Sequence, residues 1–332
     1  MLDLLEKPEV LADIAPMIDI RDLSVTFRRG RKEVKAVNGV SLTVRPGEVV
    51  ALLGESGSGK SVTMRSLLRL HPPGTLIEGE IDVAGRDVMG LSKRALGNLR
   101  GPIVSMVFQE PRLALDPVYT LGDQITETIR RHEKIRKAAA RDRALKLFQK
   151  VRIPSPERRL DTYPHEMSGG MLQRSMIAMA IACNPKVLLA DEPTTALDAT
   201  VQIQILLLIR ELQREYGLAV IFVTHDIGVA AEVADRIAVM YAGRIVEEGR
   251  VADIIREPKH PYTMGLLGAR VELANGRDRL VTIPGSPPDL SALPPGCAFA
   301  PRCERVTDAC RAAVPPLFLM DNGSRAACIH PG

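Results

Sequence analysis

A glycine-rich segment that ends in lysine and serine has the residue types best suited to phosphate chemistry in this chain. Residues 54–61 have the sequence GESGSGKS. They follow an apolar run, 48–53, that predicts a buried strand, and helical spacing of apolar residues begins at Val62. Between a strand and a helix, such a loop directs backbone N–H groups and a helix N-terminus at phosphate oxygens. We expect Lys60 to reach the β- and γ-phosphates of a nucleotide and Ser61 to ligate Mg²⁺. The predicted nucleotide-binding residues here are Gly54, Glu55, Ser56, Gly57, Ser58, Gly59, Lys60, Ser61 and Val62.

A second glycine-rich segment, residues 168–173, has the sequence SGGMLQ. Ser168 is suited to cap a helix that begins near Met171, and two glycines leave room for another body to approach the backbone. These are Gly169 and Gly170. Taken alone, the segment is weak evidence for a phosphate site, and an ordinary capped turn explains it better.

Polar side chains follow three further apolar runs that predict buried strands. Run 187–190 ends in Asp191 and Glu192, run 219–224 ends in His225, and run 103–108 ends in Gln109. An aspartate at a strand end can hold hydrated Mg²⁺, and a second carboxylate can orient and deprotonate an attacking water. Because α/β sheets bind ligands at the carboxyl ends of their strands, we expect these groups to converge on one site.

The elements that must position these residues fall into distinct stretches. From residue 17 to about 83, apolar and polar residues alternate with turn signals, which predicts antiparallel strands. The stretch between Gln109 and Ser168 has a charged, helical pattern, and strands and helices alternate again up to about 245. Beyond about 264, many prolines predict an extended, stiff segment.

In this order, the motifs resemble those of the ATP-binding subunit of an ABC transporter, over essentially the whole chain. Residues 54–61 match the Walker A motif, and residues 168–173, including Gln173, match the signature motif, although Met171 and Leu172 depart from its commonest form. The other matches are Gln109 with the Q-loop, Asp191 and Glu192 with Walker B and the catalytic glutamate, Asp198 with the D-loop, and His225 with the switch histidine. Phe27 stands where the family stacks an aromatic ring on adenine; a phenylalanine of a strand core fits as well.

This resemblance implies an α/β P-loop NTPase with a RecA-like core, an antiparallel β subdomain, a helical insertion and a cysteine-bearing C-terminal extension. We expect a leader at 1–16, a nucleotide-binding domain at 17–264 with its insertion at about 110–168, and the extension at 265–332. The implied activity is ATP hydrolysis. Its catalytic residues would be Lys60, Gln109, Glu192 and His225, with Mg²⁺ held by Ser61, Gln109 and Asp191.

The resemblance also implies an assembly. The signature motif, with Ser168, Gly169, Gly170 and Gln173, would contact ATP bound to a second ATPase subunit, identical or related, packed head to tail. Two transmembrane permease subunits and an extracytoplasmic solute-binding protein would complete the transporter. Residues 110–121 are either the contact surface for a permease or an ordinary proline-bearing loop.

Composition is consistent with a peripheral subunit. The net charge of +4 is no nucleic-acid footprint, and the basic cluster at Arg28, Arg29, Arg31 and Lys32 fits a solvated hairpin tip. The longest uninterrupted apolar run, 176–183, has eight residues, against the ~18 of a membrane span. The acidic N-terminus does not resemble a secretory signal. We therefore expect a protein at the cytoplasmic face of the cell membrane.

Four of the five cysteines lie near the C-terminal end, at Cys297, Cys303, Cys310 and Cys328. Four thiolates can hold an iron–sulfur cluster; zinc sites usually show the tight C-x₂₋₄-C spacing that is missing here, and unligated cysteines are the third possibility. His330 is a possible substitute ligand, whereas Cys183, in an apolar helical stretch, fits a core position.

The C-terminal region narrows the resemblance. Residues 260–263 (HPYT) and 296–303 (GCAFAPRC) resemble the C-terminal region of peptide-importer ATPases, the oligopeptide, dipeptide and nickel branch. Members of that branch can carry a [4Fe-4S] cluster on such cysteines. The implied function is ATP-driven import of peptides, with nickel or another small solute as the alternative. A soluble ABC ATPase acting on nucleic acid or the ribosome, and an inactive regulatory subunit, are the other readings. The single motif set and short insertion disfavour the first, and Glu192 with His225 disfavours the second.

Overall fold

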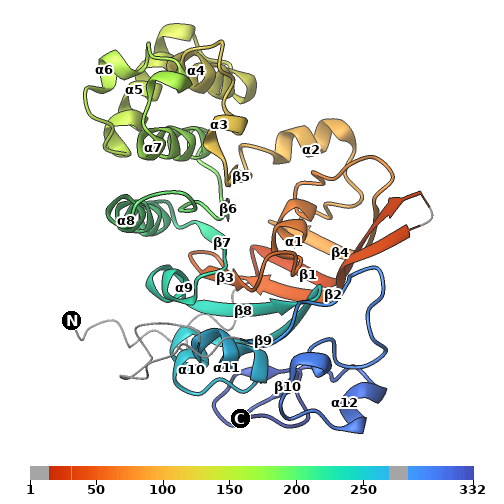
Figure 1. Cartoon of the computed structure of the whole chain (residues 1–332). Helices are drawn as coiled ribbons and strands as arrows, with labels where there is room; N and C mark the ends of the chain where they lie inside the picture. The colour runs from red at the N-terminus through yellow and green to blue at the C-terminus, as the bar shows by residue number, and fades with distance from the viewer. Residues whose placement is uncertain (1–14, 31, 269–282) are drawn as a thin grey trace.

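The computed structural model describes residues 15–30, 32–268 and 283–332, and within them the chain forms two sheets (Figure 1). The smaller sheet is antiparallel, with the strand order β2-β1-β4. Its strands are β1 (Ile18–Arg29), β2 (Lys32–Val44) and β4 (Leu76–Val83). Buried and exposed residues alternate along much of β2, because only one face of this sheet meets the core. The predicted antiparallel strands are confirmed.

The larger sheet carries the chemistry-bearing strand ends. Its order is β10-β11-β9-β8-β3-β7-β6-β5. The parallel strands are β3 (Val49–Leu53), β5 (Val104–Val107), β6 (Val187–Asp191), β7 (Ala219–Thr224) and β8 (Arg236–Tyr241). Every residue of β3, β6 and β7 is buried, as expected for parallel strands covered on both faces. Their carboxyl ends therefore meet at one edge, where the loops after β3, β5, β6 and β7 begin.

The two faces of β3 belong to two different hydrophobic clusters. Val50 and Leu52 pack with β1, β2 and α1 (Lys60–Ser66), whereas Val49, Ala51 and Leu53 pack with the helices of the opposite face. These helices include α8 (Ala199–Tyr216) and α9 (Ile227–Val233), seen beside the sheet in Figure 1. Because successive side chains of a strand point to opposite faces, this one short strand contributes to both hydrophobic clusters.

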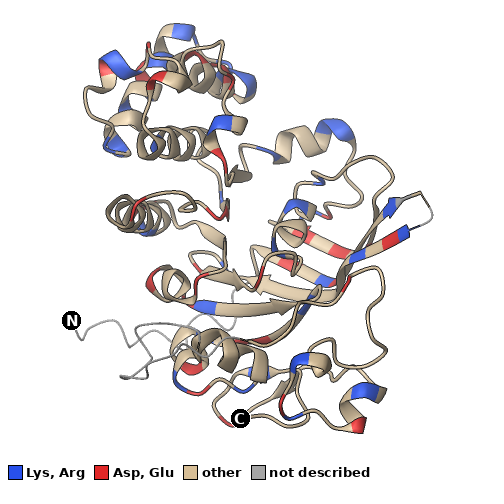
Figure 2. Ribbon diagram, viewed as in Figure 1, with Lys and Arg blue, Asp and Glu red and all other residues tan. Residues whose placement is uncertain are grey.

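A helical region projects from the sheet between β5 and β6 (Figure 1, top). It contains α3 (Pro111–Ala114), α4 (Leu121–His132), α5 (Lys137–Lys150), α6 (Pro156–Arg159), a 3₁₀ turn (Pro164–Glu166) and α7 (Gly169–Ala180). Lysine and arginine positions are spread along the ribbon of its outer helices (Figure 2). A further short helix, α2 (Lys93–Leu99), precedes β5.

The C-terminal part of the chain is folded onto the larger sheet. After β9 (Arg244–Arg250) come α10 (Val251–Arg256), α11 (Pro261–Gly268), a 3₁₀ turn (Ala300–Arg302), α12 (Asp308–Ala312), β10 (Phe318–Leu319) and β11 (Arg325–Ala326). Strand β11 pairs antiparallel with β9. Residues 283–299 contain no helix or strand, as expected for the extended segment that their prolines predict, whereas helical turns and short strands follow from Ala300 onward. Of the expected leader, residues 1–14 lie outside the described residues, and the expected boundary at 264 falls inside α11.

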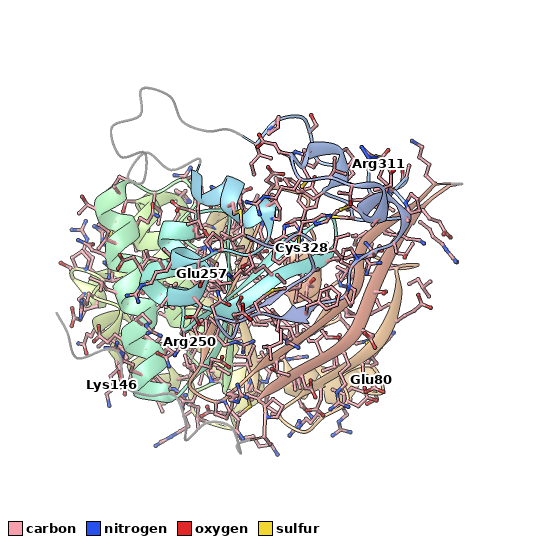
Figure 3. All side chains as sticks on the ribbon, turned by 90° about the horizontal axis from the view of Figure 1, so that it is seen from below. Glu80, Lys146, Arg250, Glu257, Arg311 and Cys328 are labelled. Atoms are coloured by element: carbon pink, nitrogen blue, oxygen red, sulfur yellow. The ribbon has the colours of Figure 1, made fainter. Side chains whose placement is uncertain are left out.

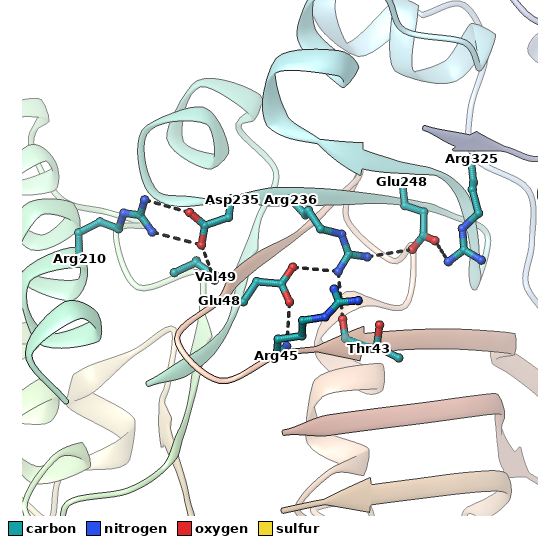
Figure 4. A network of polar contacts seen from close by, with 9 residues as sticks. All are labelled: Thr43, Arg45, Glu48, Val49, Arg210, Asp235, Arg236, Glu248 and Arg325. Carbon is teal, nitrogen blue, oxygen red and sulfur yellow. Dashed lines mark hydrogen bonds and ion pairs between the residues drawn. The ribbon is translucent and has the colours of Figure 1, made fainter. Parts of the chain in front are cut away.

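A chain of ion pairs fastens β11 to the centre of the sheet (Figure 4). Arg325 pairs with the buried Glu248, whose Oε2 lies 3.7 Å from an Arg236 nitrogen. Arg236 in turn contacts Glu48 Oε1 at 2.9 Å, and Glu48 Oε2 accepts a hydrogen bond from the Arg45 amide at 2.7 Å. Because charges removed from water are costly unless paired, this row ties the C-terminal strand to the loop before β3.

Candidate nucleotide site

The loop between β3 and α1 is held in a shape that suits phosphate binding. Gly59 begins the helix with φ 102°, and a Cβ there would lie 2.6 Å from the Ala36 carbonyl, so only glycine fits. Lys60 is almost fully buried, and its Nζ donates to the carbonyls of Gly54 at 2.7 Å and Glu55 at 2.9 Å. Burial lowers the pKa of Lys60. Bound phosphate oxygens would compete for this ammonium group.

Two predicted Mg²⁺ ligands lie side by side although they are 130 residues apart. Ser61 Oγ donates to Asp191 Oδ1 at 2.6 Å, while Arg65 contacts Asp191 Oδ2 at 3.2 Å. Asp191 is completely buried at the end of β6. A hydroxyl and a carboxylate are the oxygen donors that Mg²⁺ prefers, so the pair fits such a site.

Glu192, which follows β6, lies close to polar side chains that follow β5 and β7. Its Oε2 accepts from Gln109 Nε2 at 3.2 Å and from Thr195 Oγ1 at 3.0 Å, and His225 Nδ1 lies 3.4 Å away. The backbone of Glu192 has a left-handed φ of 44°, a strained conformation that is enriched at functional sites. Gln109, Glu192 and His225 follow β5, β6 and β7, as their positions in the sequence predict.

These groups share one cavity of about 760 Å³, a size typical of small-molecule sites. Of the predicted residues, the cavity is lined by Phe27, Glu55, Ser56, Gly57, Ser58, Gly59, Lys60, Ser61, Val62, Gln109, Glu192 and His225. Phe27 is half-buried on β1, and its ring meets His71 edge-on at 5.8 Å between ring centroids. Phe27 is thus partly packed against the second hydrophobic cluster while also facing the cavity.

Gly54 and Asp191 do not line this cavity, but they accept hydrogen bonds from Lys60 and Ser61, which do. The other predicted residues lie elsewhere, near the N-termini of α7 and α8. Ser168 Oγ caps α7 by accepting from the Met171 amide, and Asp198 Oδ1 caps α8 by accepting from the Val201 amide at 2.9 Å. Ser168 and Gly169 are exposed, so the first turn of α7 is open to an approaching molecule. None of Ser168, Gly169, Gly170, Gln173 and Asp198 lines the 760 Å³ cavity.

Two of these residues have evident roles within the chain. A Cβ on Gly170 would lie 2.7 Å from Val201 Cγ1, so this glycine lets α7 and α8 pack closely. Gln173 is 2% exposed and points into the protein, which leaves its side chain away from the open end of α7.

Comparison with known proteins agrees with this geometry. The profile of the ABC transporter family matches residues 37–195, and that of the oligopeptide/dipeptide transporter C-terminal region matches residues 246–310. The chain is 50% identical, over 95% of its length and 97% of the relative, to a putative peptide import ATP-binding protein of Brucella melitensis. The chain belongs to the ABC transporter ATPase family.

Other relatives of this ABC ATPase extend the comparison. An oligopeptide transport ATP-binding protein of Bacillus subtilis is 48% identical, over 96% of the chain and 90% of the relative. A solved ATP-binding cassette, a dimer described as a post-hydrolysis state bound to ADP and phosphate, is 30% identical and covers 71% of the chain and 99% of its own, with a TM-score of 0.64. The expected P-loop fold, family and ATPase activity are confirmed.

Several residues that line or support the cavity were missed by the sequence analysis. Leu266 and Leu290 line the cavity, Thr195 contacts Glu192, and Arg302 binds the Glu55 carboxylate through two nitrogens, at 2.8 and 3.1 Å. Glu55 and Arg302 are 247 residues apart. No local pattern in the sequence indicates such a contact, although Arg302 lies within the GCAFAPRC stretch that carries Cys297 and Cys303.

The four C-terminal cysteines line one small cavity of about 20 Å³. None is in a disulfide, and burial raises the pKa of Cys297, Cys303 and Cys328. Within the described residues, no three histidine, cysteine, aspartate or glutamate side chains are grouped so that they could hold a metal ion. Figure 3 labels Cys328 in this part of the molecule. His330 Nε2 lies 3.0 Å from Thr307 Oγ1, and Cys183 is buried in the core, as predicted.

Proposed function

We propose that this ABC ATPase hydrolyses ATP to power the import of peptides across the cytoplasmic membrane. The observation that carries the proposal is the convergence of Lys60, Ser61, Gln109, Glu192 and His225 on one cavity at the strand ends. The peptide-import names of its relatives and the match to the oligopeptide/dipeptide C-terminal region support the transported class.

The proposed reaction is in-line attack of water on the γ-phosphate. Glu192 takes the proton from the attacking water, because its carboxylate is oriented by Gln109 and Thr195 at the edge of the cavity. Lys60 neutralises charge on the phosphates, and His225, close to Glu192, contacts the γ-phosphate. Mg²⁺, held by Ser61, Asp191 and Gln109, would supply further charge stabilisation when bound.

The site is completed by a second ATPase subunit in this proposal. Ser168 and Gly169 at the exposed start of α7 lie outside the chain's own cavity, so their N–H groups are available to phosphate bound elsewhere. A head-to-tail dimer would place them on the partner's ATP. Gln173 supports α7 from inside, and Asp198 caps the neighbouring helix at the same surface.

The proposed membrane contact is the segment 110–121, which follows Gln109 directly. Leu113, Val118 and Tyr119 expose 82%, 70% and 56% of their surface there. Such exposed apolar groups suit a partner surface. The partners proposed are two permease subunits and an extracytoplasmic solute-binding protein, with this chain peripheral at the cytoplasmic face. No helix among the described residues is long and apolar enough to span a membrane.

We propose residues 17–264 as the nucleotide-binding domain, 1–16 as a leader and 265–332 as the cysteine-bearing extension. We further propose that Cys297, Cys303, Cys310 and Cys328 hold a [4Fe-4S] cluster, with zinc as the alternative. Their convergence on one cavity supports a shared ligand. Among the described residues no three such side chains are grouped to hold a metal ion, so the shared cavity is the structural support for this proposal.

Anaerobically purified protein is expected to contain iron and acid-labile sulfide, both lost in a variant with Cys303→Ser and Cys310→Ser. Iron, sulfide and zinc are measured on the same preparation. The matched control is Cys183→Ser, because Cys183 is buried in the core and does not line the cysteine cavity. Zinc without sulfide would show a zinc site in place of the cluster. Absence of both iron and zinc would refute the proposal.

Deleting the gene for this chain is expected to abolish uptake of labelled dipeptides and oligopeptides. Uptake of nickel should be unchanged, because the proposed solute is a peptide. Re-expression of the wild-type chain restores uptake, whereas a Lys60→Ala chain does not. Loss of nickel uptake with intact peptide uptake would assign the chain to the other solute.

A further inference from the structure

Arg302 is a nearly buried cation of the C-terminal extension that contacts the phosphate loop. Only 5% of its side chain is exposed. Two guanidinium nitrogens bind the two oxygens of Glu55, and the third, Nε, donates to the Pro284 carbonyl at 2.8 Å. A further contact reaches the Tyr241 hydroxyl at 3.3 Å. A two-point pair of this kind fixes the relative orientation of both groups.

The main chain of Glu55 is also bound by the C-terminal part of the chain. Its N–H donates to the Tyr262 hydroxyl at 2.8 Å, and Tyr262 lies on α11 with no exposed surface. The Glu55 carbonyl accepts from Lys60 Nζ at 2.9 Å. Arg302 therefore fixes the side chain of the residue whose main chain contacts the phosphate-binding lysine.

Arg302 lies in the chain between Ala300 and Cys303, which both line the cysteine cavity. It ends the 3₁₀ turn between Cys297 and Cys303, in which the Ala300 amide donates to Cys297 and the Cys303 amide donates to Ala300. Phe299 of this turn packs on the rings of Tyr241 and Tyr262, at 5.3 and 5.5 Å between centroids. A change in the cavity that shifts this turn must therefore move Arg302 or break its pair with Glu55.

We propose that Arg302 is a positioning residue for the phosphate loop, and that its pairing with Glu55 couples the cysteine cavity to ATP binding. The inference rests on the proposed binding of ATP at this loop. Coupling of this kind is reciprocal: if the extension holds the loop ready for ATP, bound ATP holds the extension in place.

The first test measures ATP affinity and steady-state kinetics. Arg302→Gln is expected to raise the KM and Kd for ATP by roughly 5- to 150-fold, the usual range of coupling between sites, with kcat nearly unchanged. Arg302→Lys should recover part of the affinity, since lysine keeps the positive charge but cannot bind both Glu55 oxygens through two nitrogens. Combining Arg302→Gln with Glu55→Gln should weaken binding no further than the worse single change.

Arg311→Gln is the matched control, because Arg311 is an exposed arginine on α12 of the same extension (Figure 3). Its KM should equal that of the wild type. Thermal unfolding checks that each variant is folded, and Arg302→Lys carries the test if Arg302→Gln is not. Unchanged ATP affinity in folded Arg302 variants would overturn the inference.

The second test reads the coupling from the other side. Amide hydrogen exchange of the extension is followed by mass spectrometry, with ATP and EDTA present or absent, so that hydrolysis plays no part and no free thiol is needed. ATP is expected to slow exchange of residues 297–303 in the wild type and to have no effect in Arg302→Gln, while exchange of α2 stays constant. Equal protection in both proteins would refute the coupling. Absence of ATP binding by the wild type would instead refute the proposed function.

Discussion

Glu192→Gln is expected to reduce ATP turnover by about 10²- to 10⁴-fold, the usual contribution of a general base, while ATP still binds. The substitution keeps the shape of the side chain and removes the carboxylate that would take the proton from water. Gln109 and Thr195 now donate to Glu192 Oε2, and an amide oxygen still accepts those hydrogen bonds. Single-turnover hydrolysis and nucleotide binding, measured on the same preparation, separate chemistry from affinity.

Glu232→Gln provides the matched control, because Glu232 is an exposed glutamate on α9, outside the cavity. It should turn over ATP at the wild-type rate. Wild-type turnover by Glu192→Gln would remove Glu192 from the role of base. Loss of ATP binding would show that its carboxylate serves the phosphate loop rather than the water.

Gly169→Asp is expected to abolish hydrolysis by the assembled dimer and to leave ATP binding by the isolated chain nearly intact. The new carboxylate would face the phosphates of the partner's nucleotide. Within the chain the change is mild, since a Cβ at Gly169 has only Leu197 Cδ2 nearby, at 3.7 Å. An aspartate in the first turn of α7 also suits the helix dipole. Gly170 is less useful for this test, because a Cβ there meets Val201.

Mixing two inactive chains distinguishes the arrangements. A dimer of Gly169→Asp with Lys60→Ala retains one undamaged composite site if the signature motif acts on the partner, so ATPase activity should return on mixing. If the motif acts within its own chain, both sites are damaged and activity stays absent. Gly97→Asp, at a helical glycine of α2 with open space around it, controls for the substitution itself.

Much of the site was predictable because short-range rules place it. An apolar run that is buried on both faces must be a central strand, so Asp191 and His225 had to emerge at strand ends. Gly59 has a backbone conformation that residues with a side chain rarely adopt. The sequence shows this requirement through the repeated glycines of residues 54–59. Once β3, β5, β6 and β7 align, their polar ends meet without further information.

The remainder depends on contacts that no local pattern encodes. Arg302 reaches Glu55 only because aromatic packing and the pairing of β11 with β9 bring the extension back to the sheet. Strand β11 has two residues, too few for any periodicity, so no pattern in the sequence predicted it. Likewise, the sequence indicated only that another body approaches the backbone at Gly170, and the contact with Val201 depends on how α7 and α8 pack.

The pairing of β11 with β9 also bears on how the protein is made. Strand β9 ends at Arg250 and its partner begins at Arg325, so a growing chain completes one strand well before the other. During synthesis the outer N–H and C=O groups of β9 have no strand to pair with until Arg325 and Ala326 leave the ribosome. A translation product cut short before Arg325 would keep that edge open, and open edges pair with neighbouring chains. Arg325 and Ala326 thus cover part of an edge that would otherwise be open to other chains.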